Sequence, residues 1–142
     1  MRTRSLARAG LAIVSAIFAA LLVVQVFLAG LGVFGAGGFG MHRDFGYLLS
    51  LFILLELLLA VVGRAGKAII GLVFITLVQI ILQSVFVAVR VEQPAIAALH
   101  PVNGVLMLFL TTVISWRAWR LRNDPLPVPV VEPEVAQADA AG

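Results

Sequence analysis

Four long apolar stretches, separated by short polar or glycine-rich breaks, dominate the chain. No residue from Ala9 to Met41 is charged, and three further apolar runs follow it. Because a helix of about 20 residues crosses the hydrocarbon core of a bilayer, each run is long enough to span a membrane. The pattern predicts an all-α fold, a polytopic four-helix transmembrane bundle with spans at residues 6–32, 42–62, 68–89 and 95–116.

The breaks between these spans carry turn signals. Residues 35–40 are too rich in glycine for a helix interior, and residues 63–67 read as a tight basic turn. The third break ends at Pro94, which suits the first turn of a helix. Residues 1–122 are therefore predicted to form one transmembrane domain built from two tandem helical hairpins.

The basic residues predict the orientation of these spans. Eight of the ten Lys and Arg residues fall at the N-terminus, in the 63–67 turn and just after the fourth span. By the positive-inside rule both termini are cytoplasmic, and the protein is expected in the plasma membrane. Residues 123–142 are rich in proline and mildly acidic, which predicts a disordered cytoplasmic tail. A signal peptide is the alternative for the basic, apolar start, but the length of the first run favours a transmembrane helix.

Composition limits the partners. Hydrophobic residues make up 62% of the chain, charged residues 12%, and the mean hydropathy is +1.12, so the lipid bilayer is the main expected partner. The net charge of +3 does not indicate nucleic acid, because the arginines flank apolar runs. With no cysteine, disulfides, Cys-ligated zinc, iron–sulfur clusters and thioether-linked haem are excluded. Any cofactor must be held by His, Gln, Glu, Met or the backbone.

The two hairpins carry the same motif, His-x-x-x-Gly-x-Leu. An offset of 58 positions links His42 with His100, Gly46 with Gly104, Leu48 with Leu106, and Gln25 with Gln83. A repeated two-span unit keeps its topology, so a pseudo-two-fold axis along the membrane normal is expected between the halves. This axis would place the only two histidines at matching depth near the outer face, on opposed helices.

Two inward-facing histidines on opposed helices suggest a cofactor site. The hypothesis is that His42 and His100 bind the iron of a b-type haem from both sides. Gly46 and Gly104, one turn deeper on the same faces, would leave space beside the imidazoles. The haem propionates would lie near Arg43 or Arg90.

Two alternatives for the histidines remain open. One is that each is an interfacial residue at a helix start, and Pro101 supports this for His100 because proline favours the first helical turn. Another metal is also considered, although a closed zinc site needs four ligands and would have to recruit Asp44 and Glu92.

A polar seam is predicted to continue through the bundle interior, and it consists of Gln25, Glu56, Gln79 and Gln83. Glu56 lies well inside a span, where a charge costs on the order of 3 kcal/mol on insertion scales. It is therefore a proton or substrate site, a neutral group hydrogen-bonded to a neighbouring helix, or a side chain that snorkels toward Arg64. The glutamines are expected to form interhelical hydrogen bonds worth about 1 kcal/mol each.

Three segments carry a resemblance to known proteins: Gln-Val-Phe-Leu-Ala-Gly at 25–30, His-Arg-x-x-Gly-Tyr from His42, and Leu-His-Pro-Val-Asn-Gly at 99–104. Together they resemble a family of small four-span prokaryotic membrane proteins of unknown function, over about residues 6–120. More remotely, the paired histidines are similar to half of haem A synthase and to other four-helix b-type cytochrome modules. This second likeness is architectural, since Met41 precedes His42 where that enzyme has Glu.

The sequence thus leaves three functions open. The leading one is a b-type haem electron carrier or redox-sensing subunit, working with a redox partner or as a homo-oligomer. The second is a small transporter or channel subunit that uses Glu56 and the glutamine seam. The third is a structural subunit without a ligand. No Ser–His–Asp set or phosphate-binding motif is present, so an enzyme is not favoured.

Overall fold

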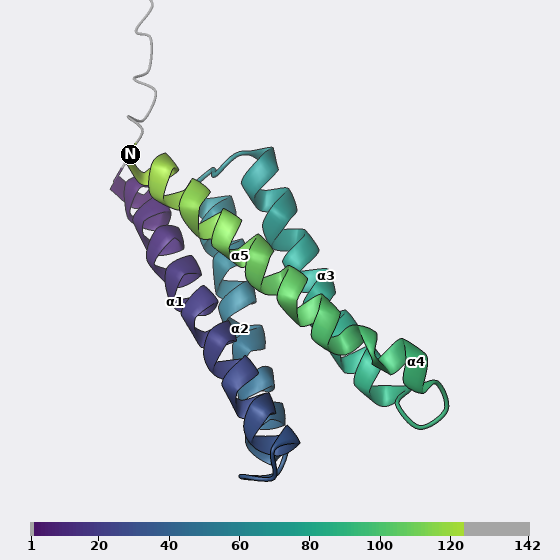
Figure 1. Cartoon of the computed structure of the whole chain (residues 1–142). Helices are drawn as coiled ribbons and strands as arrows, with labels where there is room; N and C mark the ends of the chain where they lie inside the picture. The colour runs from purple at the N-terminus through teal and green to yellow at the C-terminus, as the bar shows by residue number, and fades with distance from the viewer. Residues whose placement is uncertain (1, 124–142) are drawn as a thin grey trace, which may run out of the picture.

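The computed structural model describes residues 2–123, so residues 124–142 of the predicted tail lie outside it. The helices are α1 (Arg2–Val33), α2 (Gly40–Val62), α3 (Lys67–Ala88), α4 (Pro94–Ala97) and α5 (Leu99–Asn123) (Figure 1). Within the described range no strand occurs, which confirms the predicted all-α class.

Four segments are long and apolar enough to cross a membrane: α1, α2, α3, and α4 together with α5. The outer surface carries large apolar side chains, and Phe27, Leu51 and Phe109 are each more than 60% exposed. Such a surface is stable against lipid, where burial of apolar groups is not what holds helices together. The predicted four-helix membrane bundle is therefore confirmed as an architecture.

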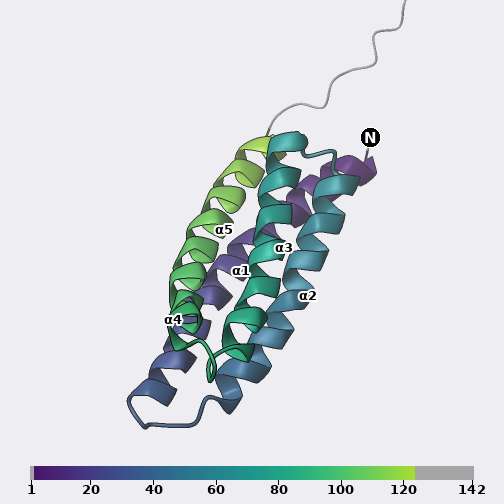
Figure 2. The same ribbon diagram turned by 90° about the vertical axis from the view of Figure 1, so that its right-hand side faces the viewer.

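The four long helices form a ring in which each packs against two neighbours. α1 packs against α2 and α5, and α3 packs against α5 and α2, so α1 lies diagonal to α3 and α2 lies diagonal to α5. The N-terminus, the α2–α3 turn and the end of α5 lie at one end of the bundle (Figures 1 and 2). The α1–α2 and α3–α4 connections lie at the other end, which we call the loop end.

The buried positions repeat with the same offset of 58 residues that links the two motifs. Eight buried residues of the first hairpin have a buried counterpart in the second, namely Ala7 and Ala65, Leu11 and Ile69, Ser15 and Val73, Phe18 and Thr76, Leu49 and Met107, Ile53 and Thr111, Glu56 and Ile114, and Ala60 and Ala118. The two hairpins therefore present equivalent faces to a common interior. At four of these eight pairs the chemistry differs, because a polar residue in one half has an apolar equivalent in the other.

The fourth span departs from its predicted boundaries of 95–116. Pro94 begins the short α4 as predicted, but the chain turns at Ala98 and a new helix starts at Leu99. Proline at 101 has no N–H, and within a continuous helix its ring would clash with the carbonyl of residue 97. Restarting the helix puts Pro101 in the first turn of α5, where no hydrogen bond is lost.

Candidate functional site

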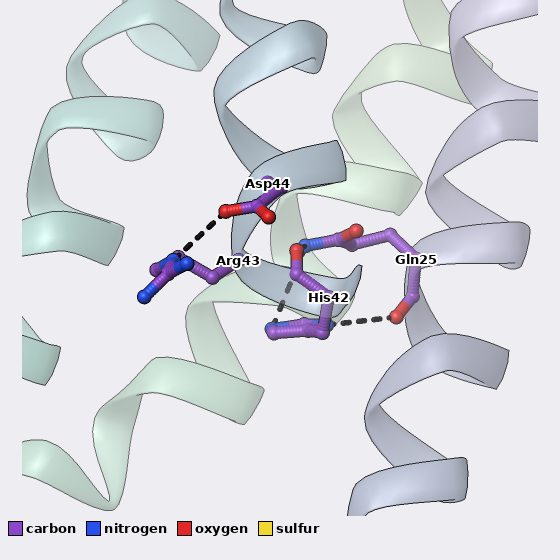
Figure 3. A network of polar contacts seen from close by, with 4 residues as sticks. All are labelled: Gln25, His42, Arg43 and Asp44. Carbon is purple, nitrogen blue, oxygen red and sulfur yellow. Dashed lines mark hydrogen bonds and ion pairs between the residues drawn. The ribbon is translucent and has the colours of Figure 1, made fainter. Parts of the chain in front are cut away.

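In the first hairpin, His42 at the start of α2 is held by Gln25 of α1. The imidazole Nδ1 lies 3.0 Å from the main-chain oxygen of Gln25. In return, the Gln25 side-chain amide donates to the main-chain oxygen of His42 over 2.8 Å. Figure 3 shows the bond from the imidazole to the Gln25 oxygen. The two bonds together fix the ring between the two helices.

In the second hairpin, His100 of α5 repeats part of this arrangement with Gln83 of α3. Its Nδ1 lies 3.3 Å from the main-chain oxygen of Gln83, at the same sequence separation of 17 residues. The duplication predicted from the sequence thus extends to the hydrogen-bond partner of each imidazole. A main-chain carbonyl inside a helix can be this partner, because its oxygen can accept a second hydrogen bond besides the one within the helix.

These bonds determine which nitrogen of each ring carries the proton. A main-chain carbonyl only accepts, so Nδ1 of His42 and of His100 must be the donor. In the neutral imidazole, Nε2 then keeps its lone pair. A metal-binding histidine commonly has this arrangement, with its second nitrogen bonded to a carbonyl or carboxylate.

The two imidazoles meet across the bundle diagonal. Their ring centroids are 5.9 Å apart, and the ring planes are inclined by 67°. Since α2 and α5 do not pack against each other, the histidine side chains fill the space between them. Near-perpendicular rings at this distance form an edge-to-face pair, which stabilises the loop end of the bundle.

The glycines one turn below the histidines lie against the glutamine amides. A Cβ on Gly46 would lie 2.9 Å from Gln25 Nε2, and a Cβ on Gly104 would lie 3.2 Å from Gln83 Nε2. The glycines therefore make room for the glutamine amides beside the imidazoles. The Gln25 Nε2 atom also lies 3.5 Å from His42 Nε2, which is the longest distance for a hydrogen bond.

A cavity of about 170 Å³ adjoins the two histidines between α1 and α5. Its walls are mainly apolar, with small residues such as Ala29 and Gly104. The thioether side chain of Met107, which is only 5% exposed, also lines it. Met107 lies about 10 Å beyond His100 along α5, so it lines the end of the cavity away from the imidazoles.

The two arginines expected beside a cofactor lie elsewhere. Arg43 is exposed and forms an ion pair with Asp44 over 2.9 Å, on the side of α2 away from Gln25 (Figure 3). Arg90 is exposed and donates to the main-chain oxygen of Val87. Neither arginine lines the cavity.

Glu56 is fully buried in the bundle interior. It follows His42 by fourteen residues, which places it about 21 Å further along α2. Neither carboxyl oxygen has a hydrogen-bond partner within residues 2–123. The Ser15 hydroxyl is near, but it donates to the main-chain oxygen of Leu11 over 2.8 Å.

The other seam residues also point inward. Gln79 is buried, and its main-chain oxygen accepts a bond of 2.9 Å from the Asn103 amide of α5. Thr111 is fully buried, and its hydroxyl has no partner within the described residues. The seam does not form one continuous polar path, because Phe18 and Ile53 are fully buried at positions between Glu56 and the histidines.

Two polar residues of the interior were given no role from the sequence, Ser15 and Asn103. Asn103 follows His100 by three residues, so helical spacing contained the signal for it. Ser15 falls in an apolar run, and only its burial opposite Glu56 distinguishes it. Within residues 2–123 no group of three His, Asp or Glu residues gathers to hold a metal.

Comparison with known protein families gives one match, which covers part of this chain. Residues 25–89 match a family of unknown function, DUF6220. This match includes Gln25, His42 and Gln83 and ends before His100. Searches of curated proteins and of solved structures gave no match, so the likeness to haem A synthase stays a prediction. The structure is a bundle of four helices that are long and apolar enough to span a membrane, and the family matched over residues 25–89 has no known function.

Proposed function

We propose that the protein is a metal-binding membrane protein in which His42 and His100 coordinate one metal ion between them. The observation that carries this proposal is the 5.9 Å between the two ring centroids. Two imidazoles bound on opposite sides of one metal, at about 2 Å from each nitrogen, have ring centres about 6 Å apart. The observed separation matches this distance, and metal binding would turn the rings out of their edge-to-face contact until both Nε2 atoms face the ion.

The hydrogen bonds of the two rings support the same proposal. Each Nδ1 is occupied by a main-chain carbonyl, so each Nε2 lone pair is the group left to bind a metal. A metal would have to displace the 3.5 Å contact between Gln25 Nε2 and His42 Nε2, which is too long to oppose it strongly. The Nδ1 bonds thus hold the two rings close together before a metal arrives, and only the tilt of the rings has to change.

The sequence suggested that the metal between the histidines is the iron of a b-type haem. The volume of the cavity argues against a haem. Its 170 Å³ is close to the roughly 150 Å³ of an engineered cavity that admits benzene. Cofactor pockets typically reach about 300–1,000 Å³. A macrocycle would require the Gln25 and Gln83 side chains to leave the glycine positions that they fill. The geometry therefore supports a single ion better than a haem.

The transport hypothesis has less support within one chain. Glu56 lies about 21 Å from His42 along the helix, and the fully buried Phe18 and Ile53 lie between the two groups. Phe18 also stacks on Phe52, with ring centroids 6.3 Å apart. A substrate path through the seam would have to open this packed layer.

The experiment is elemental analysis and an absorption spectrum of protein purified in detergent from cells supplied with haem and transition metals. One metal per chain in the wild type, lost in His42→Ala and in His100→Ala, supports the paired centre. A haem spectrum lost in the same variants would support the centre in its haem form. Metal-free protein under all conditions, or metal retained by both variants, would contradict the proposal.

A further inference from the structure

A second cavity lies at the end of the bundle opposite the histidines, where α3 begins and α5 ends. Its volume is about 380 Å³, within the range of about 300–1,000 Å³ that ligand pockets in proteins cover. α3 and α5 separate toward this end (Figure 1), and the side chains of Ala65 and Ala68 are too small to fill the space between them. Apart from Arg117 and Arg120, the lining residues are aliphatic or aromatic. The cavity therefore combines a cationic wall with an apolar one.

Arg117 and Arg120 are three residues apart on α5, so they lie on neighbouring positions of one helix face. The Arg120 guanidinium lies 4.8 Å from the centre of the Trp116 ring, and this cation–π contact holds it at the cavity wall. Both arginines are exposed, and the one ion pair within residues 2–123 joins Arg43 and Asp44. No carboxylate in the described part of the chain therefore neutralises the cationic wall.

The surroundings of the cavity are basic as well. The end of the bundle on which it lies carries eight of the ten Lys and Arg residues (Figures 1 and 2). Of the acidic residues in the described range, Asp44 and Glu92 are exposed at the loop end, and Glu56 is buried in the interior. An anion entering this cavity thus meets attraction from the whole end of the bundle and no repulsion from a nearby carboxylate.

Two tryptophans indicate the depth of the cavity in the membrane. Trp116, which lines the cavity, and Trp119 are both exposed near the end of α5. Tryptophan is enriched where a membrane helix meets the lipid headgroups. The arginines next to these rings are therefore expected at the level of the lipid phosphates.

We infer that this cavity binds the phosphate of an anionic phospholipid, with Arg117 and Arg120 as its binding residues. A guanidinium donates two parallel N–H bonds to phosphate oxygens, which makes arginine well suited to this group. The apolar wall, which includes Ile69 and Leu121, would contact the carbon atoms next to the phosphate. A lipid with net negative charge fits better than a zwitterionic one, because no carboxylate described at this end would pair with a choline group. This inference is independent of the metal centre at the loop end.

The test is native mass spectrometry of the full chain, purified in a neutral detergent and titrated with phosphatidylglycerol or with phosphatidylcholine of the same acyl chains. We expect one phosphatidylglycerol to bind per chain more tightly than phosphatidylcholine. Arg117→Gln and Arg120→Gln should each weaken its binding by about fivefold, since one basic residue near the membrane surface contributes about this factor. Both positions are exposed, so the variants should fold, and circular dichroism in detergent checks this.

Arg122→Gln is the matched control. Arg122 stacks on Trp119 at 4.1 Å as Arg120 stacks on Trp116, and its loss changes the charge equally, but it does not line the cavity. Its affinity for phosphatidylglycerol should therefore equal that of the wild type. Equal losses in all three variants would show diffuse attraction to the basic end and would overturn the site.

A third titration, with inorganic phosphate, distinguishes a lipid headgroup from a free anion. We expect bound phosphatidylglycerol to remain when inorganic phosphate is added at the same concentration. Displacement would assign the cavity to free phosphate and overturn the lipid assignment. Equal binding of phosphatidylglycerol and phosphatidylcholine by the wild type would also overturn it.

Discussion

The imidazoles of His42 and His100 lie 5.9 Å apart although the helices that carry them do not pack against each other. In a ring of four helices the diagonal is the longest distance across the interior, and two medium-sized side chains meet there. Each ring is held from its own hairpin, by a main-chain carbonyl of α1 or α3. The pair is therefore positioned by the duplication, with one half of the site from each repeat.

Alanine at the helical glycines tests the packing of the glutamines. Replacing glycine by alanine inside a helix stabilises it by about 1 kcal/mol. Gly71→Ala should show this gain in full, since nothing lies within 4 Å of the new Cβ. At Gly46 the Cβ would meet Gln25 Nε2 at 2.9 Å and break its bond to His42, which offsets the gain by about 1 kcal/mol.

Thermal unfolding in detergent measures this difference. The expected order of stability is Gly71→Ala above Gly104→Ala, with Gly46→Ala lowest, because the contact at Gly104 is the looser one at 3.2 Å. A rise for Gly46→Ala equal to that for Gly71→Ala would mean that Gln25 does not occupy the space beside this glycine.

The unpaired carboxyl of Glu56 predicts that its removal stabilises the bundle. A buried polar group without a partner costs about 1–3 kcal/mol, so Glu56→Leu, of similar size, should raise the melting temperature in detergent. The reciprocal control is Ile114→Glu, at the equivalent buried position of the second hairpin, which should lower it. A less stable Glu56→Leu would show that the carboxyl forms a stabilising interaction in the membrane-embedded protein.

The sequence predicted the fold because the property that defines it is local. The lengths of the apolar runs were enough to predict the four spans. The pairing of the histidines followed from the 58-residue offset, which also links the buried positions of the two hairpins. The sequence did not predict that Gln25 and Gln83 fill the space beside the glycines, since this depends on the packing of side chains from two helices. Nor did it predict the break at Ala98, because Pro94 and Pro101 each suit a helix start and only their spacing forces two helices.

The distribution of basic residues predicts the orientation. Reporter fusions after Gly38 and after Gln93 should be active outside the cytoplasm, and a fusion after Gly66 should be active inside it. The structure groups the first two positions at the loop end and the third at the opposite end. A cytoplasmic signal after Gly38 would reverse the orientation and place the histidine pair at the inner face.

The most direct test of the paired centre is a double-mutant cycle on the affinity for the metal ion that elemental analysis of the purified protein identifies. If His42 and His100 bind the same ion, either His→Ala change removes the site, and the second change costs little more. We therefore predict that His42→Ala, His100→Ala and the double variant lose affinity by nearly the same factor, which is a strong departure from additivity. Losses that simply add, or one variant that binds like the wild type, would contradict a centre shared between the two histidines.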